Sequence, residues 1–163
     1  MKQPEQVTVA SVLAVQYSTG CSMDPGEIAT TMGKAFETLH QFAGIHALQF
    51  ASPPRAIYTG YGAEGVDFTV AVPVAADSAV DAEESEITVG EIPGGQALRF
   101  IHEGPYPKLR ETYEQITAWM KEQGMLESEA DWAKYMPMWE EYINDPESTP
   151  EEELITHIYV PLG

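Results

Sequence analysis

The segment WEEYI at residues 139–143 places acidic and aromatic side chains next to one another. Side chains alternate along a β-strand, so Glu140 and Tyr142 share one face and Glu141 points to the other. Burial of an unpaired carboxylate is costly, and a buried Glu therefore needs a cation or hydrogen-bond donors. Two interpretations stay open. Either Glu140 and Tyr142 line a pocket for a cationic or polar aromatic ligand, or this is an edge strand with Glu140 in water.

Other aromatic residues are candidates for the walls of such a pocket, since aromatic rings also offer cation–π contacts. Tyr58 occupies a place in the first half of the chain that corresponds to Tyr142 in the second. Trp119 lies at the edge of the apolar stripe of a predicted helix, and Phe42 is its counterpart in the first half. Tyr113 lies on the same stripe as Trp119, where an aromatic residue is more often part of the core.

Two helices and several strands are predicted to position these residues. The first helix starts at about Pro25 or Gly26, with Asp24 as N-cap, and runs to Phe42. The second has Leu109, Tyr113, Ile116 and Met120 on one stripe and ends before Gly124. The turn at 102–107 precedes it, with His102 in a structural role. A short helix is plausible at 130–134, and strands are predicted at 7–17, 55–59, 66–74, 87–92, 97–101, 139–143 and 154–162.

Two halves of the chain, at about 7–74 and 87–163, follow the same order of elements. An acidic connector at 75–86 joins them. Each half reads as β-α-β-β, with one helix on a one-sided sheet, and pairing of the two halves gives one larger sheet. We therefore predict an α+β fold in which two pseudo-symmetric β-α-β-β repeats form one antiparallel sheet with two main helices on one face. Residues 1–163 would form a single domain, with a ligand pocket at the seam between the repeats.

Composition narrows the functional classes. The chain of 163 residues has 26 acidic and 8 basic residues, for a net charge of −18, which argues against direct nucleic-acid binding. The same excess of charge also suits plain solubility. The sequence has a single cysteine, Cys21, and no secretory signal, which favours a cytoplasmic protein. It also has no apolar run of about 20 residues, so no membrane span is expected. His40 and His46 are wrongly spaced for a metal site, and no cofactor is expected.

Two strings carry a resemblance to a known family. They are IPGGQALRFIHEGPYPKLRETYEQITAWMKEQG at 92–124 and YINDPESTPEEELITHIYVPL at 142–162. The His-x-Gly-Pro-Tyr turn, the Tyr-x-x-Asp-Pro step and the Thr-x-Ile-Tyr-x-Pro-Leu end resemble the GyrI-like (gyrase-inhibitor-like) family, which includes the effector-binding domains of AraC-type and MerR-type multidrug regulators. The resemblance implies the same fold and a small-molecule pocket. Many relatives have a pocket Glu where this chain has His157, so Glu140 becomes the expected acid.

The resemblance implies a stand-alone protein that binds a small hydrophobic or cationic ligand, for sensing or sequestration. Hydrolysis of a bound toxin is an open extension, since some relatives hydrolyse aromatic toxins. The alternative is an acidic inhibitor that docks on a protein such as gyrase or a regulator. No helix-turn-helix fits before Val7, so we expect no DNA-binding domain in this chain. No catalytic residue is assigned; if one exists, Glu140, Tyr142 and His157 are the candidates. The expected ligand-binding residues are Glu140, Tyr142, Trp119, Phe42, Tyr58, Tyr113, His157 and Trp139.

Overall fold

The computed structural model describes residues 3–62, 64–75 and 86–162 of the chain. Its strands are β1 (Glu5–Val9), β2 (Val12–Cys21), β3 (Arg55–Gly62), β4 (Gly65–Pro73), β5 (Ile87–Ile92), β6 (Gly95–Glu103), β7 (Met138–Tyr142) and β8 (Ile155–Pro161). The helices are α1 (Pro25–Ile45) and α2 (Leu109–Glu122), with short 3-10 helices η1 (Tyr106–Lys108), η2 (Glu129–Tyr135) and η3 (Glu151–Glu153). Almost all of the predicted acidic connector at 75–86 lies outside the described residues.

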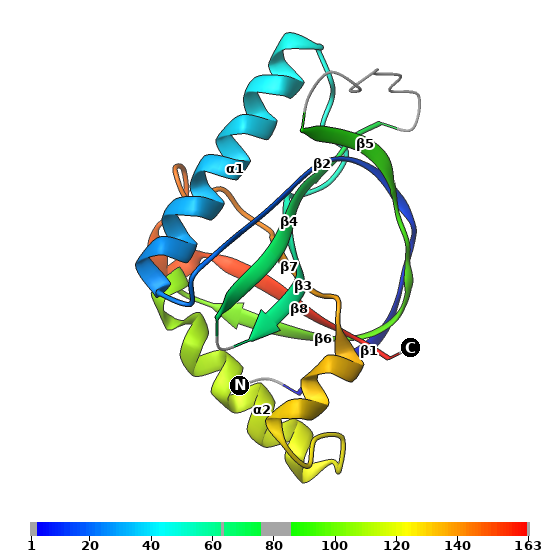
Figure 1. Cartoon of the computed structure of the whole chain (residues 1–163), viewed down its shortest axis with the longest axis vertical. Helices are drawn as coiled ribbons and strands as arrows, with labels where there is room; N and C mark the ends of the chain where they lie inside the picture. Colours follow the sequence, from blue (N-terminus) through cyan, green and yellow to red (C-terminus); the bar gives the residue numbers. More distant parts are fainter. Residues whose placement is uncertain (1–2, 63, 76–85, 163) are drawn as a thin grey trace.

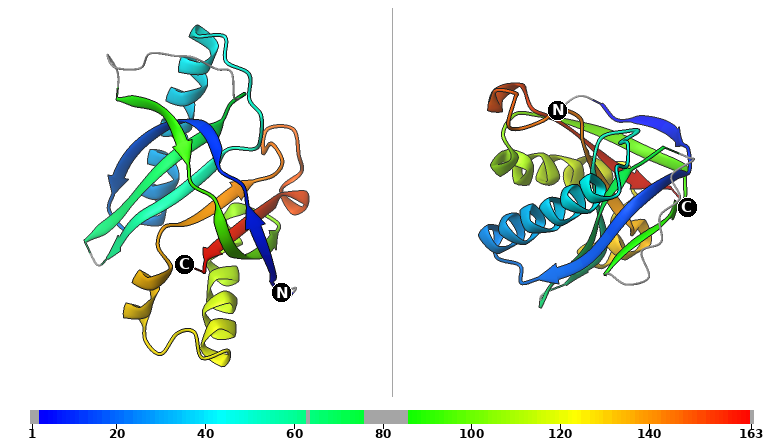
Figure 2. Two further views of the ribbon diagram at one scale, coloured as in Figure 1. Left: turned by 90° about the vertical axis from the view of Figure 1, so that its right-hand side faces the viewer. Right: turned by 90° about the horizontal axis from the view of Figure 1, so that it is seen from above.

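One antiparallel sheet of eight strands has the order β1-β6-β8-β7-β3-β4-β2-β5. At its centre β3 pairs with β7, with Ala56 opposite Glu140. At its ends β1 pairs with β6 and β5 pairs with β2, so strands that are far apart in the sequence lie side by side. Figures 1 and 2 show a curled sheet with α1 and α2 on the same side of it. The predicted α+β class with a single antiparallel sheet is confirmed, and the pseudo-symmetric repeat stays a prediction.

The Val-rich run at 7–17 forms two strands, where the sequence predicted one. β1 ends at Val9 and β2 begins at Val12, because the first pairs with β6 and the second with β4 and β5. Gly94 packs against this break, and a Cβ on it would collide with the backbone of Val9 and Ala10. Only glycine allows so close an approach of two backbones.

Helix α1 begins as the sequence predicts. The Asp24 side chain accepts a hydrogen bond from the Glu27 backbone N–H at 3.0 Å, and Pro25 is the first helical residue. Its apolar stripe buries Leu39 fully against a cluster that includes Phe68. Burial of a side chain of this size contributes about 2 kcal/mol. The helix continues beyond the predicted end at Phe42 to residue 45.

Helix α2 packs its stripe on the second part of the sheet. Ile116 and Met120 are fully buried against Phe100 and Ile158. After the helix ends, Gly124 has a φ of +73°, the left-handed conformation that glycine adopts without strain. Thus the apolar periodicity and the glycine stop both predicted this element correctly.

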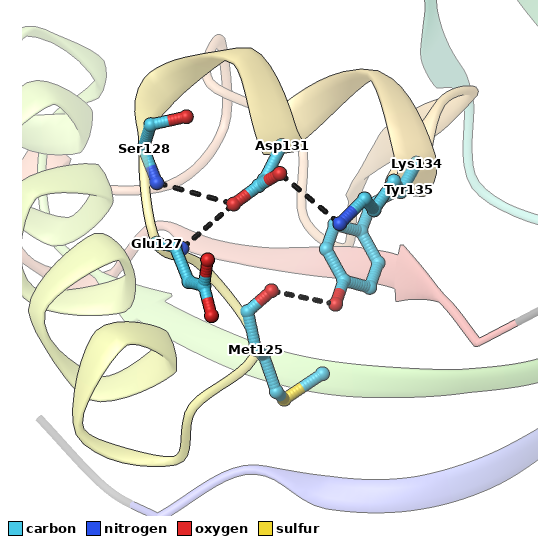
Figure 3. Close-up of polar contacts among 6 residues, drawn as sticks. All are labelled: Met125, Glu127, Ser128, Asp131, Lys134 and Tyr135. Carbon is cyan, nitrogen blue, oxygen red and sulfur yellow. Dashed lines mark hydrogen bonds and ion pairs between the residues drawn. The ribbon is translucent and has the colours of Figure 1, made fainter.

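The segment after α2 forms η2, which extends beyond the short helix expected at 130–134. The Asp131 carboxylate accepts hydrogen bonds from the backbone N–H groups of Glu127 and Ser128, at 2.7 and 3.1 Å, and lies 3.1 Å from Lys134 Nζ. The Tyr135 hydroxyl donates to the Met125 carbonyl at 2.9 Å (Figure 3). These contacts fix a segment that has little apolar periodicity of its own. Across the described residues, no helix combines the length and the apolar character that a membrane span requires.

Candidate functional site

The centre of the sheet holds a buried acidic residue. Glu140 lies in β7 with 3% of its surface exposed, and Tyr142, two residues later, lies on the same face. Tyr58 reaches the same place from the neighbouring strand β3, and Tyr113 reaches it from α2. We call this side of the central strands, defined by Tyr58, Glu140 and Tyr142, the helix face.

Three tyrosine hydroxyl groups donate hydrogen bonds to the Glu140 carboxylate. Tyr113 donates to Oε2 at 2.5 Å, and Tyr142 and Tyr58 donate to Oε1 at 2.7 and 3.3 Å. The Tyr142 hydroxyl also lies 3.3 Å from the sulfur of Met32 in α1. A hydroxyl group has one proton, and a carboxylate is a stronger acceptor than a thioether, so the proton is directed to Glu140. Donors from two strands and a helix therefore satisfy one carboxylate.

Burial dominates the protonation of this cluster. Desolvation raises the pKa of Glu140, and the hydrogen bonds from Tyr113, Tyr142 and Tyr58 offset part of this rise. The pKa values of Tyr58, Tyr113 and Tyr142 are raised well above their ordinary value, first by burial and then by the Glu140 charge. All three tyrosines therefore stay protonated at neutral pH and remain available as donors.

Further aromatic side chains surround the cluster. Phe36 of α1 and Tyr106 of η1 both contact the Tyr142 ring edge to face, with centroids 5.9 and 5.6 Å away. Tyr58 packs against Phe68, with centroids 6.4 Å apart. Tyr106 is partly exposed, whereas Glu140 is buried.

The structure brings together four of the eight predicted ligand-binding residues: Glu140, Tyr142, Tyr58 and Tyr113. Phe42 instead contacts His46, with centroids 4.3 Å apart, and Trp119 contacts Phe100 and donates a hydrogen bond to Gln3. These contacts give Phe42 and Trp119 no direct link to Glu140. The roles of all eight in binding stay predictions.

Trp139 and His157 lie on the opposite face of the sheet. Trp139 stacks on Tyr159 with centroids 4.8 Å apart, and His157 Nδ1 lies 4.0 Å from Glu141 Oε1. Neither residue can join a site with Glu140 without a change of strand register, because the alternation of β7 and β8 sends them to the other side. His157 therefore lies beside Glu141 and not beside Glu140.

The sequence did not indicate the roles of Tyr106 and Met32. Tyr106 follows Gly104-Pro105 at the start of η1, and the tight turn directs its ring onto Tyr142. In the same turn His102 is buried, and its Nε2 lies 3.2 Å from the Pro105 carbonyl and its Nδ1 2.6 Å from the Thr112 hydroxyl. A carbonyl only accepts, so Nε2 carries the proton. These contacts agree with the structural role that the sequence predicted for this histidine.

Among the described residues, no group of three or more His, Cys, Asp or Glu side chains is arranged to hold a metal ion. The helix face instead offers one carboxylate, three hydroxyl groups and several aromatic rings. Such a set can bind an organic cation, which needs an anion and aromatic faces rather than a ring of ligand atoms.

Comparison with solved structures shows the same fold in several proteins. The C-terminal domain of EcmrR has a TM-score of 0.74 at 18% identity, with 98% of this chain and 96% of that domain covered. SAV2435 bound to tetraphenylphosphonium has a TM-score of 0.63 at 15% identity, with 98% and 93% covered. A hydrolase from Listeria innocua has a TM-score of 0.57 at 14% identity, with 98% and 91% covered.

The chain spans 56% of the EcmrR chain seen in a complex with DNA. No curated protein sequence matches this chain. The model of the family described as the GyrI-like small molecule binding domain, however, matches residues 2–162. The chain therefore belongs to the GyrI-like family of small-molecule-binding domains.

Proposed function

We propose that the protein binds a small aromatic cation at the helix face, with the Glu140 carboxylate as the opposite charge. The observation that carries this proposal is the burial of Glu140 beneath three tyrosines that donate hydrogen bonds to it. Membership in a small-molecule-binding family supports it, as does the likeness to SAV2435 bound to tetraphenylphosphonium. Binding would serve to sense or to sequester the cation.

The way in which Glu140 is satisfied favours a cation as the ligand. Tyrosine hydroxyls are neutral, so they stabilise the ionised carboxylate without cancelling its charge. Among the described residues no Arg or Lys forms an ion pair with Glu140. A cation that enters the site would gain a charge pair in a region of low dielectric and cation–π contacts with the rings.

Access to Glu140 requires a movement, because the residue is only 3% exposed. Tyr106 is suited to move, since it is partly exposed and is held against Tyr142 by a ring contact. It also belongs to a three-residue 3-10 helix rather than to the sheet. We expect the Tyr106 ring to swing away and then to cover the bound cation.

The first prediction concerns the charge of Glu140. Titration of tetraphenylphosphonium by calorimetry is expected to show saturable binding to the native protein. In Glu140→Gln the affinity should fall at least about tenfold, or 1.4 kcal/mol, because the amide keeps the shape but loses the charge. Glu111→Gln removes the same charge from the exposed surface of α2 and should bind like the native protein.

Equal affinity of both variants would contradict the assignment of Glu140. Tyr142→Phe keeps the ring and should weaken binding less than Glu140→Gln. Mass spectrometry of the recovered ligand is expected to show it intact. A product that forms with the native protein and not with Glu140→Gln would instead assign hydrolysis to the site, with Glu140 as an acid–base group.

A further inference from the structure

The face of the sheet opposite the helix face carries a second cluster of charged and aromatic side chains. Along one row of paired residues Arg55 lies beside Glu141, and Glu141 lies beside His157. Along the next row Trp139 lies beside Tyr159, and Tyr159 lies beside Arg99. Paired residues have Cβ atoms about 5 Å apart, so the six side chains form one contiguous patch, which we call the arginine face.

Buried donors on the arginine face lack acceptors. In the described part of the chain, Arg55 Nε, Arg99 Nε and Trp139 Nε1 are buried without a hydrogen-bond partner. Arg55 is only 6% exposed, and its Nε lies 3.4 Å from Glu141 Oε2, within ion-pair distance but without hydrogen-bond geometry. Three N–H groups that donate at every accessible pH are thus unsatisfied in one patch, which is unusual for a folded protein.

The two arginines of the arginine face are matched by two carboxylates, one inside the patch and one at its rim. Arg55 and Arg99 both act on the Glu141 carboxylate and lower its pKa, whereas burial raises that pKa by more. Burial and the nearby Arg99 lower the pKa of His157, so the imidazole is neutral at pH 7. Two guanidinium groups therefore face one inner carboxylate, and Glu5 at the exposed rim pairs with Arg99 at 2.8 Å and balances the second guanidinium.

The patch can be reached from solvent. The side chains of Glu141, His157 and Arg99 are 13, 19 and 28% exposed, although Arg55 beneath them is almost completely covered. The chain has a net charge of −18 and only 8 basic residues, so a partly accessible cluster that contains two of them differs in charge from the acidic composition of the chain as a whole. An acceptor that arrived there would meet the unsatisfied donors of Arg55, Arg99 and Trp139.

We propose that the arginine face binds a small carboxylate, at a site separate from the cation site on the helix face. The ligand's oxygen atoms would accept hydrogen bonds from Arg55, Arg99 and Trp139. Guanidinium groups suit the planar geometry of a carboxylate, whose oxygen atoms are the acceptors that these donors lack. The stacked rings of Trp139 and Tyr159 offer an apolar surface for a ring attached to that carboxylate.

The test uses benzoate as the probe and the full chain in both calorimetry and tryptophan emission. Benzoate should bind saturably, and benzamide, which has the same shape without the charge, should not bind. Arg55→Gln and Arg99→Gln should each lower the affinity for benzoate about tenfold or more. The matched control is Arg110→Gln, which removes the same charge from an exposed site on α2 and should leave the affinity unchanged.

Arg55 is buried, so thermal melting must first show that Arg55→Gln is folded. Arg99 is partly exposed, so Arg99→Gln alone can test the proposal by its affinity for benzoate if Arg55→Gln is not folded. The proposal is overturned if benzoate shows no saturable binding at millimolar concentration, if benzamide binds equally well, or if Arg99→Gln and Arg110→Gln have the same affinity as the native protein. It stands independently of the helix face, because loss of cation binding would leave these results unchanged.

Discussion

Two neighbouring glutamates of β7 are buried in different ways. Burial raises the pKa of both Glu140 and Glu141. On the helix face neutral tyrosine hydroxyls compensate for the lost water, whereas on the arginine face the charge of Arg55, followed by that of Arg99, does so. A carboxylate with neutral donors keeps a net negative charge that a ligand can pair with. The charge of a carboxylate beside guanidinium groups is already neutralised. This contrast is the reason to assign a cation to one face and an anion to the other.

The pKa of Glu140 predicts how cation binding depends on pH. Burial raises this pKa above its ordinary value of 4.5, so part of the ligand-free protein carries a proton on Glu140 above that pH. A cation favours the ionised form and must displace the proton. Affinity should therefore increase with pH above about 4.5, by at most about tenfold per pH unit, until Glu140 is fully ionised.

The measurement is a series of titrations with a phosphonium cation, whose charge does not change with pH. In Glu140→Gln the affinity should not increase with pH over the same range. Glu111→Gln is the control and should show the same pH dependence as the native protein. An affinity for the native protein that falls as pH rises would show that the cation is not paired with Glu140.

Part of the site could be predicted from the sequence. The alternation of β7 correctly separated Glu140 and Tyr142 from Glu141 and Trp139. It could not show that the Tyr58 and Tyr113 hydroxyls meet on one carboxylate, since these residues are 82 and 27 positions from Glu140. Nor could it reveal the arginine face, which depends on the order of strands in the sheet.

At the scale of single elements, η2 depends on one carboxylate. Asp131 accepts hydrogen bonds from two backbone N–H groups and contacts Lys134, as Figure 3 shows. The bonds from Glu127, followed by the contact with Lys134, lower the pKa of Asp131 to about 2. A depressed pKa means that the stabilisation is complete above the ordinary value of 3.8 and is lost as pH falls through about 2.

We therefore predict that Asp131→Ala lowers the melting temperature at pH 7 and lowers it less at pH 2, where the native carboxyl group is partly protonated. Glu129→Ala, in the same short helix, is the control and should have a small effect at either pH. Melting curves followed by circular dichroism would measure this. An equal loss at both pH values would indicate that Asp131 acts through packing rather than through its charge.

Local signals predicted the starts of elements better than their ends. Asp24-Pro25 marks the start of α1 by a mechanism that needs only neighbouring residues. The end was predicted at Phe42, but the helix continues through Gly44 to residue 45. The break between β1 and β2 was missed as well, since the run of valines contains neither Gly nor Pro and the break follows from distant partners.

At the scale of the whole molecule, the two halves depend on each other for their sheet. The first half supplies β1 to pair with β6, the second supplies β5 to pair with β2, and β3 pairs with β7 between them. Each half alone would expose unpaired edges and the face that the other half covers.

We predict that residues 1–75 and 86–163, produced as separate chains, each lack a cooperative thermal transition and a dispersed NMR spectrum. Mixing them should restore both, because the pairings between halves are then available. A single half that melts cooperatively as a monomer would show that the exchanged strands are not required for folding.

The net negative charge of the whole chain is relevant to which protein partners it could bind. A net charge of −18 would favour a fast encounter with a basic protein, and docking on gyrase or a regulator stays a prediction. The site on the helix face does not depend on this alternative, since Glu140 is buried and so does not contribute to the surface that would dock.

The alternation of β7 has a consequence for how this protein can vary. Adjacent codons for Glu140 and Glu141 specify opposite faces, so a substitution changes one face at a time. Loss or gain of one codon just before Trp139 would shift the register, pointing Glu141 at the tyrosines and Glu140 at the arginines. Selection from a library of point and single-codon changes should therefore retain many substitutions in this strand and no length changes.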